Sequence, residues 1–213
     1  MKSFSWLLAS SAAMLSLCFG TGCAVDQWGN YMQSAFDSDL EMRNGVLVQQ
    51  QLLDDNEYNN QYKRPGPMKE LKYVTIHNTY NFGPAINERN YLNNRRDKAY
   101  ISFHYAVDEN GAIQILRDDE RGWHAGDGDG PGNANSIAIE ICRSRCYDDR
   151  DGEYRGAEAN AVKLAAWLLD RYQLSDEALK MHQDWSGKFC PHRILEEQRW
   201  DEFKARVKAA RRH

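Results

Sequence analysis

The chain has 213 residues, of which 42% are hydrophobic and 27% charged, and its formal net charge is −4. These values are ordinary for a soluble globular protein, and the length leaves room for one compact domain with additional segments. A general nucleic-acid-binding protein normally carries a basic surface, so the negative charge argues against that class and against non-specific anionic partners.

Residues 1–23 differ in composition from the rest of the chain. Lys2 is their only charged residue, and it is followed by the apolar stretch Trp6 to Phe19 and then by small residues up to Cys23. This order is typical of a signal peptide, and the apolar stretch is shorter than the roughly 20 residues that span a bilayer. We therefore expect an exported protein of the cell envelope.

The Gly-Cys pair that ends this segment also resembles a bacterial lipoprotein signal. In that case Cys23 carries lipid and anchors the protein to a membrane. Gly20 stands where the lipoprotein pattern prefers leucine, so plain secretion is the alternative.

Residues 24–65 are acidic and polar. Between Ala24 and Tyr62, seven acidic residues stand against one basic residue, Arg43. We interpret the segment as a linker or loosely ordered arm, with room for one helical piece near Val46 to Leu53. Proline and glycine in Lys63 to Pro67 then predict that a single folded domain covers residues 66–213.

The first predicted elements of this domain are strands. Lys72 to Ile76 has the β-branched and aromatic content of a buried strand and ends on His77, and residues 84–94 follow as a helix. Ile101 to Val107 and Ala112 to Leu116 form a predicted hairpin, because Asn-Gly is the strongest short hairpin signal.

Ser136 to Cys142 is an apolar strand that Glu140 interrupts. Alternation places Ser136, Ala138, Glu140 and Cys142 on one face and three isoleucines on the other. One interpretation is a solvated outer face. The other is a carboxylate that faces a polar site and has a raised pKa, which suits a general base.

Two helices complete the chain. Residues 157–172 carry one continuous apolar stripe and are predicted to be core, while residues from Trp200 onward form an amphipathic closing helix whose basic face we expect to be solvated.

Three cysteines remain once the signal segment is removed: Cys142, Cys146 and Cys190. A disulfide between Cys142 and Cys146 would leave one thiolate for a metal. Two unpaired thiols are the alternative.

Potential metal ligands concentrate in Met181 to Arg193, which Gly187 and Pro191 keep from being one regular helix. Imidazole and thiolate suit zinc, and His77, His182 and Cys190 make the three-ligand set that a catalytic zinc site retains. The loop from Gly122 to Gly126 adds an aromatic ring and an imidazole in backbone that can approach a ligand closely.

Five segments of the sequence resemble one known family in their content and order. They are Tyr73–Asn78, Ser102–Tyr105, Trp123–Gly126, Asn135–Ile141 and His182–Arg193. The chain resembles the zinc-dependent N-acetylmuramoyl-L-alanine amidases of the phage-lysin and peptidoglycan-recognition type. The glutamate and the Cys-Pro-His-Arg ending make the phage-type members the most similar. The signal segment and the acidic arm lie outside the resemblance.

The resemblance implies an α/β fold, a mixed sheet flanked by helices with the site in a groove at one edge. It also implies Zn²⁺ held by His77, His182 and Cys190, with Glu140 as the catalytic base and Lys188 as the residue that stabilises the transition state. Trp123 and His124 are our choice for substrate contact, and His104 is expected to line or support the groove. His192 is expected to brace the loop around Cys190.

We therefore expect an exported, monomeric peptidoglycan hydrolase that cleaves the amide between N-acetylmuramic acid and L-alanine. The first alternative is a muropeptide-binding module on the same fold without turnover. The second is a structural zinc site closed by a fourth ligand, for which Cys142 or Cys146 would be the candidate.

Overall fold

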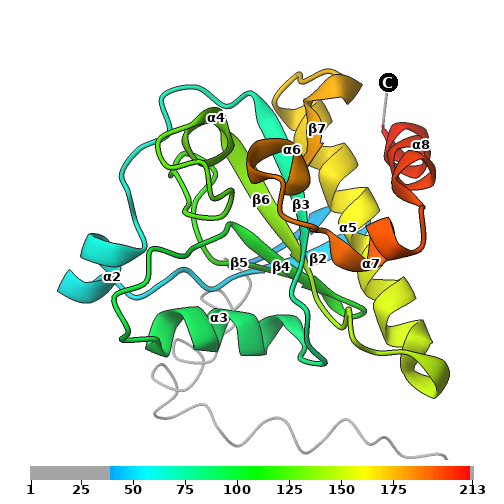
Figure 1. The fold of residues 1–213 in the computed structure, drawn as a ribbon, viewed down its shortest axis with the longest axis horizontal. Helices are drawn as coiled ribbons and strands as arrows, with labels where there is room; N and C mark the ends of the chain where they lie inside the picture. The colour runs from blue at the N-terminus through cyan, green and yellow to red at the C-terminus, as the bar shows by residue number, and fades with distance from the viewer. Residues whose placement is uncertain (1–38, 212–213) are drawn as a thin grey trace, which may run out of the picture. The chain divides into compact units, whose positions relative to one another are not determined.

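A seven-stranded mixed β-sheet runs through residues 39–211, the part of the chain that the computed structural model describes (Figure 1). The strand order is β1-β2-β5-β4-β6-β3-β7, and only the β1–β2 and β4–β5 pairs are antiparallel. The strands are β1 (Leu40–Arg43), β2 (Val46–Gln50), β3 (Tyr73–Asn78), β4 (Tyr105–Asp108), β5 (Gly111–Gln114), β6 (Ser136–Ile141) and β7 (Leu179–Met181). The predicted mixed sheet with flanking helices is confirmed.

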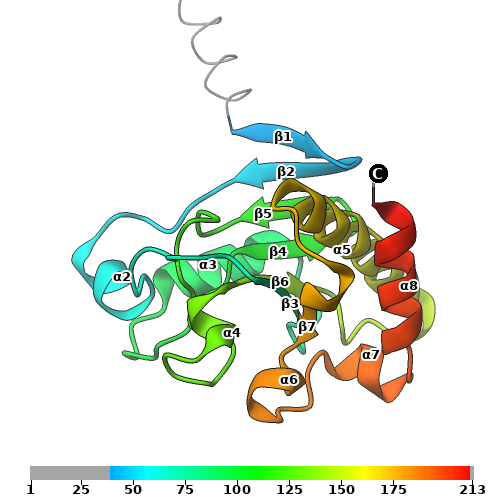
Figure 2. The same ribbon diagram turned by 90° about the horizontal axis from the view of Figure 1, so that it is seen from above.

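Helices cover both faces of this sheet, with α5 on one face and α3 on the other (Figure 2). The long helix α5 (Asp151–Arg171) also packs against α8 (Trp200–Ala210), while α3 (Ala85–Asn94) contacts β4 and β5. The shorter helices are α2 (Glu57–Tyr62), α4 (Pro131–Ala134), α6 (Gln183–Ser186), α7 (His192–Glu196) and the 3-10 turns η1 (Asp148–Arg150) and η2 (Asp176–Ala178). No helix within residues 39–211 combines the length and the apolar character needed to cross a bilayer.

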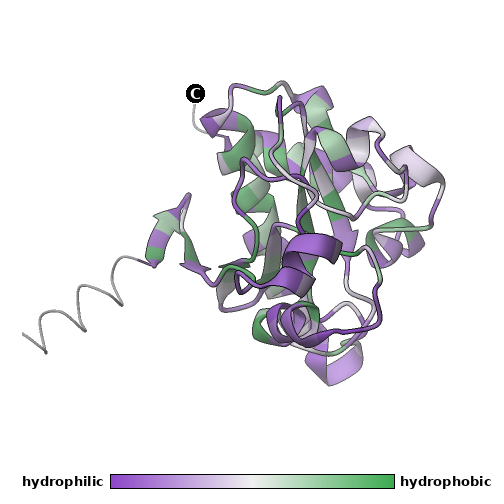
Figure 3. Ribbon diagram, turned by 90° about the vertical axis from the view of Figure 1, so that its left-hand side faces the viewer, coloured by the Kyte–Doolittle hydropathy of each residue, from purple (hydrophilic) through white to green (hydrophobic). Residues whose placement is uncertain are grey.

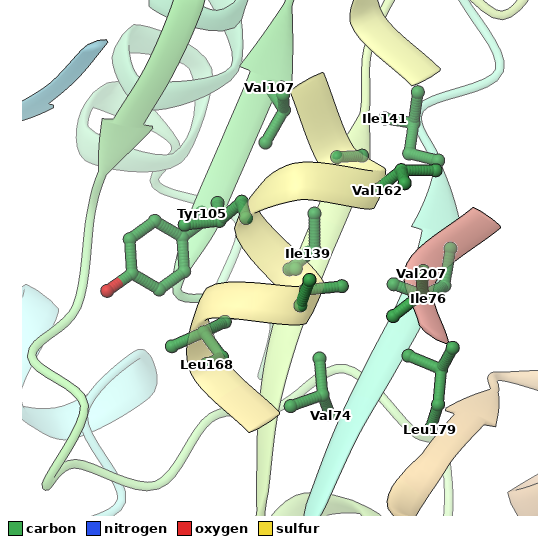
Figure 4. Close-up of a cluster of buried hydrophobic side chains, with 14 of the residues drawn as sticks. Val74, Ile76, Tyr105, Val107, Ile139, Ile141, Val162, Leu168, Leu179 and Val207 are labelled. Carbon is green, nitrogen blue, oxygen red and sulfur yellow. The ribbon is translucent and has the colours of Figure 1, made fainter. Parts of the chain in front are cut away.

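The main hydrophobic core lies between α5 and the sheet (Figure 4). The isoleucines of β6 point into it, and the apolar stripe of α5 packs on them with Leu164 and Leu168 fully buried. Each such side chain contributes about 1.5–3 kcal/mol to folding. In Figure 3 hydrophobic residues concentrate in the strands and the helices packed on them, while hydrophilic residues prevail in α2.

A second, smaller core lies under α3. It joins Leu92 of α3 to Ala138 and Cys142, which stand on the face of β6 opposite to the isoleucines. The predicted alternation of β6 is therefore confirmed, and Glu140 belongs to this second face. Because both faces of β6 are covered, Glu140 has no solvated outer face to occupy, and that interpretation was wrong.

The prediction that residues 24–65 form a linker was wrong for residues 39–65. These residues belong to the folded unit, because β2 pairs in parallel with β5, and Val46 and Val48 are buried in the main core. Residues 46–50 are a strand rather than the helical piece we expected. The composition was misleading because polar side chains here are buried with partners: Arg43 donates to the Tyr105 hydroxyl and to Gln114.

Gly111 shows how closely β2 approaches the β4–β5 hairpin. A Cβ built on this residue would lie 2.3 Å from the carbonyl oxygen of Leu47, and its φ of 151° also disfavours other residues. The glycine of the predicted Asn-Gly turn therefore serves the sheet as well as the turn. Residues 1–23, where we expect a signal peptide, and residues 24–38 lie outside the described residues.

Two smaller differences concern the start of elements. β4 begins at Tyr105 rather than Ile101, because Ser102 and His104 donate their backbone N–H groups to Trp123 and Ala138 instead of extending the hairpin. Helix α5 begins at Asp151, six residues before the predicted start.

Cys142, Cys146 and Cys190 are all free thiols, so the alternative with unpaired cysteines is the one observed.

Candidate metal centre and active site

Three parallel strands bring the candidate site residues to one edge of the sheet. His77 in β3 is the direct register partner of Glu140 in β6, and Ile76 pairs with Met181 of β7, so that His182 follows immediately beyond the sheet. The carboxyl ends of parallel strands are the usual place for a site in an α/β sheet. The chain then turns through α6 and returns, so that the Gln183 N–H donates to the Cys190 carbonyl at 3.0 Å.

Gly187 makes this return possible. It ends α6 in the left-handed conformation at φ 76°, which glycine adopts without a steric penalty. The loop therefore places Cys190 opposite His182, as expected for a segment that Gly187 and Pro191 interrupt.

His77, His182 and Cys190 form the one group of potential metal ligands found within residues 39–211. Their donor atoms lie within 4.8 Å of one another, and all three side chains are buried. The two Nδ1 atoms are 3.0 Å apart, and the Cys190 sulfur is 3.8 Å from His77 Nδ1. A tetrahedral zinc ion would separate such atoms by about 3.4 Å (N to N) and about 3.6 Å (N to S). The arrangement fits zinc.

The protonation states of the three donor residues also favour a bound cation. Burial, with nearby positive charge, lowers the pKa of His77 well below its ordinary value and that of His182 to about 4, so both rings are neutral ligands at pH 7. Burial raises the pKa of the Cys190 thiol to about 12, although backbone N–H hydrogen bonds from Asn78 and His192 act to lower it. A thiolate at this position therefore needs a positive partner such as a metal ion.

Outer hydrogen bonds orient the two imidazoles. With Nδ1 of His77 directed to the metal position, its Nε2 is 3.2 Å from Nδ1 of His124. The ring of His182 is hydrogen-bonded to the backbone of Ala125. Such contacts fix the tautomer and orientation of a ligand.

Glu140 lies next to the ligands without being one of them. Its Oε1 is 3.9 Å from Nδ1 of His77, and its Oε2 is buried without a hydrogen-bond partner. Burial and the neighbouring Glu88 raise the pKa of Glu140 to about 8, while Lys188 opposes them. An unpaired buried carboxylate oxygen is costly, and a raised pKa is typical of a group that exchanges protons.

Lys188 is exposed on the loop between α6 and Cys190, and it lines the same groove. Its positive charge contributes to the lowered pKa values of His77 and His182. The lysine therefore places a cation beside the donor cluster, where negative charge on a bound group would be stabilised.

The donor cluster opens into a groove of about 1200 Å³. Trp123 and His124, the two residues chosen for substrate contact, both line it. His104 does not, since it is fully buried, its Nδ1 accepts the Ala138 N–H and its Nε2 donates to the Glu120 carbonyl. Its position therefore supports the groove loop from within and disagrees with a direct substrate contact.

His192 supports Cys190 mainly through its backbone. The His192 N–H hydrogen-bonds the Cys190 sulfur, while its ring packs edge-on against Tyr80 with centroids 4.5 Å apart. This position agrees with the expected bracing of the loop around Cys190, with the backbone N–H as the donor.

Several groove residues were missed from the sequence. Glu88 is buried beside Glu140 and accepts a hydrogen bond from Asn81 at 2.7 Å. A signal was present, because Glu88 shares the buried face of α3 with Ala85 and Leu92 at helical spacing. The exposed aromatic residues Tyr80, Tyr91, Tyr100 and Phe189 also line the groove, and no sequence pattern marked them.

Three convergent donors lie at the ends of parallel strands, beside a partly buried carboxylate and a lysine. This arrangement is typical of the metallohydrolase class. The chain belongs to the N-acetylmuramoyl-L-alanine amidase family, Amidase_2, which matches residues 67–193. The resemblance seen in the sequence is thereby confirmed.

The relatives and solved structures agree with this assignment. N-acetylmuramoyl-L-alanine amidases CwlA and XlyB of Bacillus subtilis (strain 168) are 41% and 42% identical over 77% and 76% of the chain. The alignments cover 58% and 49% of those relatives, so the chain spans about half the length of the curated relatives that it matches. The structure of PlyL is 43% identical with a TM-score of 0.68, covering 75% of this chain and 96% of PlyL. The solution structure of the PlyG catalytic domain is 43% identical with a TM-score of 0.69, covering 76% of this chain and 94% of that domain.

Proposed function

We propose that the protein is a zinc-dependent amidase of peptidoglycan. It hydrolyses the amide between the lactyl group of N-acetylmuramic acid and L-alanine. The observation that carries this proposal is the convergence of three buried donor atoms within 4.8 Å, with the Glu140 carboxylate 3.9 Å from one of them. Membership of the amidase family supports the choice of substrate.

His77, His182 and Cys190 would hold the zinc ion, and three is the number of protein ligands that catalytic zinc sites retain. A bound zinc ion supplies Lewis-acid polarisation of a carbonyl and lowers the pKa of water to about 7.

Glu140 is the proposed general base and acid. Its carboxylate is close enough to the ligands to take a proton from the attacking water and to pass it to the leaving amine. Burial and Glu88 raise its pKa to about 8, so the carboxyl group exchanges a proton near neutral pH.

Lys188 is the proposed stabiliser of the oxyanion that forms at the scissile carbonyl. It stands at the groove wall two residues before Cys190, so the same loop positions one metal ligand and the cation. An interaction that strengthens as charge develops accelerates the reaction rather than only improving binding.

Trp123 and His124 are proposed to contact the substrate, because both line the groove next to the donor cluster. We propose that the protein acts at the cell wall after export through the segment of residues 1–23. Lipidation of Cys23 would retain it at a membrane, and otherwise it is secreted. The pattern of that segment supports this proposal.

The second candidate, a muropeptide-binding module without turnover, is less favoured because the structure keeps Cys190 and the partly buried Glu140 together with the histidines. A closed structural zinc site is less favoured as well. The Cys142 thiol donates to the Glu140 carbonyl and the Cys146 thiol to the Glu153 carboxylate. Neither sulfur belongs to the donor cluster.

One assay separates these functions. Purified protein is incubated with peptidoglycan, with and without a chelator, and new amino termini on alanine are quantified together with bound zinc. The proposal expects chelator-sensitive release. Protein that carries one zinc ion per chain and releases no alanine termini would be a binding module instead.

A further inference from the structure

Four aromatic rings form a row that starts outside the region matched by the amidase family. Tyr58 and Tyr62 of α2 have ring centroids 4.7 Å apart, Tyr62 and Tyr100 5.5 Å, and Tyr100 and Trp123 5.7 Å. The last two residues line the groove, and Tyr100 is 59% exposed. The row therefore leads from the groove to α2 at the same end of the molecule, where Figure 1 shows α2 beyond the end of α3.

Helix α2 holds the loop that carries Tyr100. The Tyr58 hydroxyl accepts the Lys98 N–H at 2.5 Å, and the Arg96 guanidinium lies 4.9 Å from the centre of the Tyr58 ring. Asn59 is fully buried and donates to Asn93 of α3. These contacts hold the loop before Tyr100, and the Ser102 N–H bond to the Trp123 carbonyl at 2.9 Å holds it after. Tyr100 therefore keeps its exposed position at little further entropic cost on binding.

The chemistry at this end of the groove suits an uncharged ligand. Arg121 is paired with Asp129 at 2.7 Å and Arg95 with Asp97 at 2.5 Å. Arg96, which lies on the Tyr58 ring, donates to the backbone carbonyls of Asn93 and Arg95. An exposed tyrosine offers a flat apolar face together with a polar edge. A sugar ring is complementary to it, since it has an apolar face of C–H groups and a rim of hydroxyl and acetamido groups. The charged stem peptide is not.

We propose that Tyr100, supported by Tyr62 and Tyr58, is a sugar-stacking residue that extends the groove toward α2 and binds the N-acetylated sugar rings of the glycan strand. The identity of the glycan rests on the proposed peptidoglycan amidase function. Tyr58 and Tyr62 are positioning residues in this account, because they act through the Tyr100 loop.

The test uses the full chain with Glu140→Gln, in which we expect turnover to be slowed. Calorimetry measures the binding of a peptide-free N-acetylglucosamine hexamer to this protein. Tyr100→Ala should weaken binding of the hexamer at least tenfold, and Tyr100→Phe should restore it because the ring remains. Phe82→Ala is the matched control, since Phe82 is 54% exposed but does not line the groove. Tyr58→Phe, which removes only the hydroxyl, should weaken binding less than Tyr100→Ala.

A second arm titrates the free stem peptide, whose affinity should not change in Tyr100→Ala. Three outcomes would overturn the proposal. The hexamer does not bind at all, Tyr100→Ala binds it with unchanged affinity, or Tyr100→Ala loses affinity for the hexamer and the stem peptide equally. Cleavage by the chain with native Glu140 is scored separately. Cleavage without Tyr100-dependent hexamer binding refutes only the sugar site, and Tyr100-dependent binding without cleavage refutes only the amidase function.

Discussion

His77 and Glu140 are register partners on the adjacent parallel strands β3 and β6, and Oε1 of Glu140 lies 3.9 Å from Nδ1 of His77. The distance between the proposed ligand and the proposed base is thus set by the hydrogen-bond ladder of two central strands. A site built on strands is held more precisely than one built on loops. The loop that brings Cys190 and Lys188 has only to complete it.

Cys190→Ser should reduce bound zinc strongly, because the softer thiolate ligand is replaced by a weaker hydroxyl. Zinc per chain is measured by metal analysis after dialysis. Cys146→Ala is the control, since Cys146 is also a buried free thiol but lies outside the donor cluster. Equal zinc content in both variants would remove Cys190 from the ligand set.

Lys188→Ala should lower kcat about 10²–10³-fold, the usual cost of removing one group that stabilises an oxyanion. Zinc content should persist, because the lysine is not a ligand. Lys69→Ala serves as the control for loss of an exposed lysine away from the groove. A change confined to KM would assign Lys188 to substrate binding instead.

The proposed site could be predicted from the sequence to a large extent, and the reason is local. Three local features depart from the patterns of ordinary helices and strands. They are a histidine at the end of a strand, a glutamate within an apolar strand, and a loop interrupted by Gly187 and Pro191. Strand alternation then places Glu140 on one face without knowledge of the fold. His104 shows the limit, because burial and two backbone partners are properties of the tertiary structure.

The β1–β2 hairpin and the row of aromatic rings could not be predicted in this way. Val46 and Val48 lie in a short apolar patch of a polar segment, and their burial depends on the pairing of β2 with β5 far along the chain. Likewise Tyr62 meets Tyr100 only after folding.

Gly111→Ala should destabilise the fold by more than about 1 kcal/mol, because the new methyl group would meet the Leu47 carbonyl in a left-handed conformation that alanine disfavours. Gly152→Ala, in the first turn of α5 with open space around it, should be neutral or stabilise by up to about 1 kcal/mol. Urea unfolding measures the free energy of unfolding of the two variants and of the native chain. Equal stability would mean that β2 does not pack against Gly111 as described.

Acid should weaken the contact between α5 and the C-terminal helices. Burial tends to raise the pKa values of Glu158 and Glu197, but hydrogen bonds from arginines outweigh it, lowering the pKa of Glu158 and bringing that of Glu197 to about 2. A carboxyl group with a lowered folded-state pKa stabilises the fold above its unfolded pKa, and this stabilisation is lost as the pH falls from about 4.5 toward 2.

Thermal unfolding between pH 7 and pH 2.5 measures this loss. Glu158→Gln should lower the Tm at pH 7, because it leaves Arg199 and Arg206 without the carboxylate that pairs with both. It should also flatten the dependence of Tm on pH. An unchanged pH dependence would show that Glu158 does not contribute to acid sensitivity.

Glu140→Gln tests the central claim most directly, because it removes the exchangeable proton while it keeps the size of the side chain next to His77. Amide cleavage and bound zinc are measured on the same preparation, beside the native chain. The account predicts a fall in kcat of about 10²–10⁴-fold with zinc retained at one ion per chain. Retained turnover, or loss of zinc with the activity, would contradict the role of Glu140 as the base beside a three-ligand metal site.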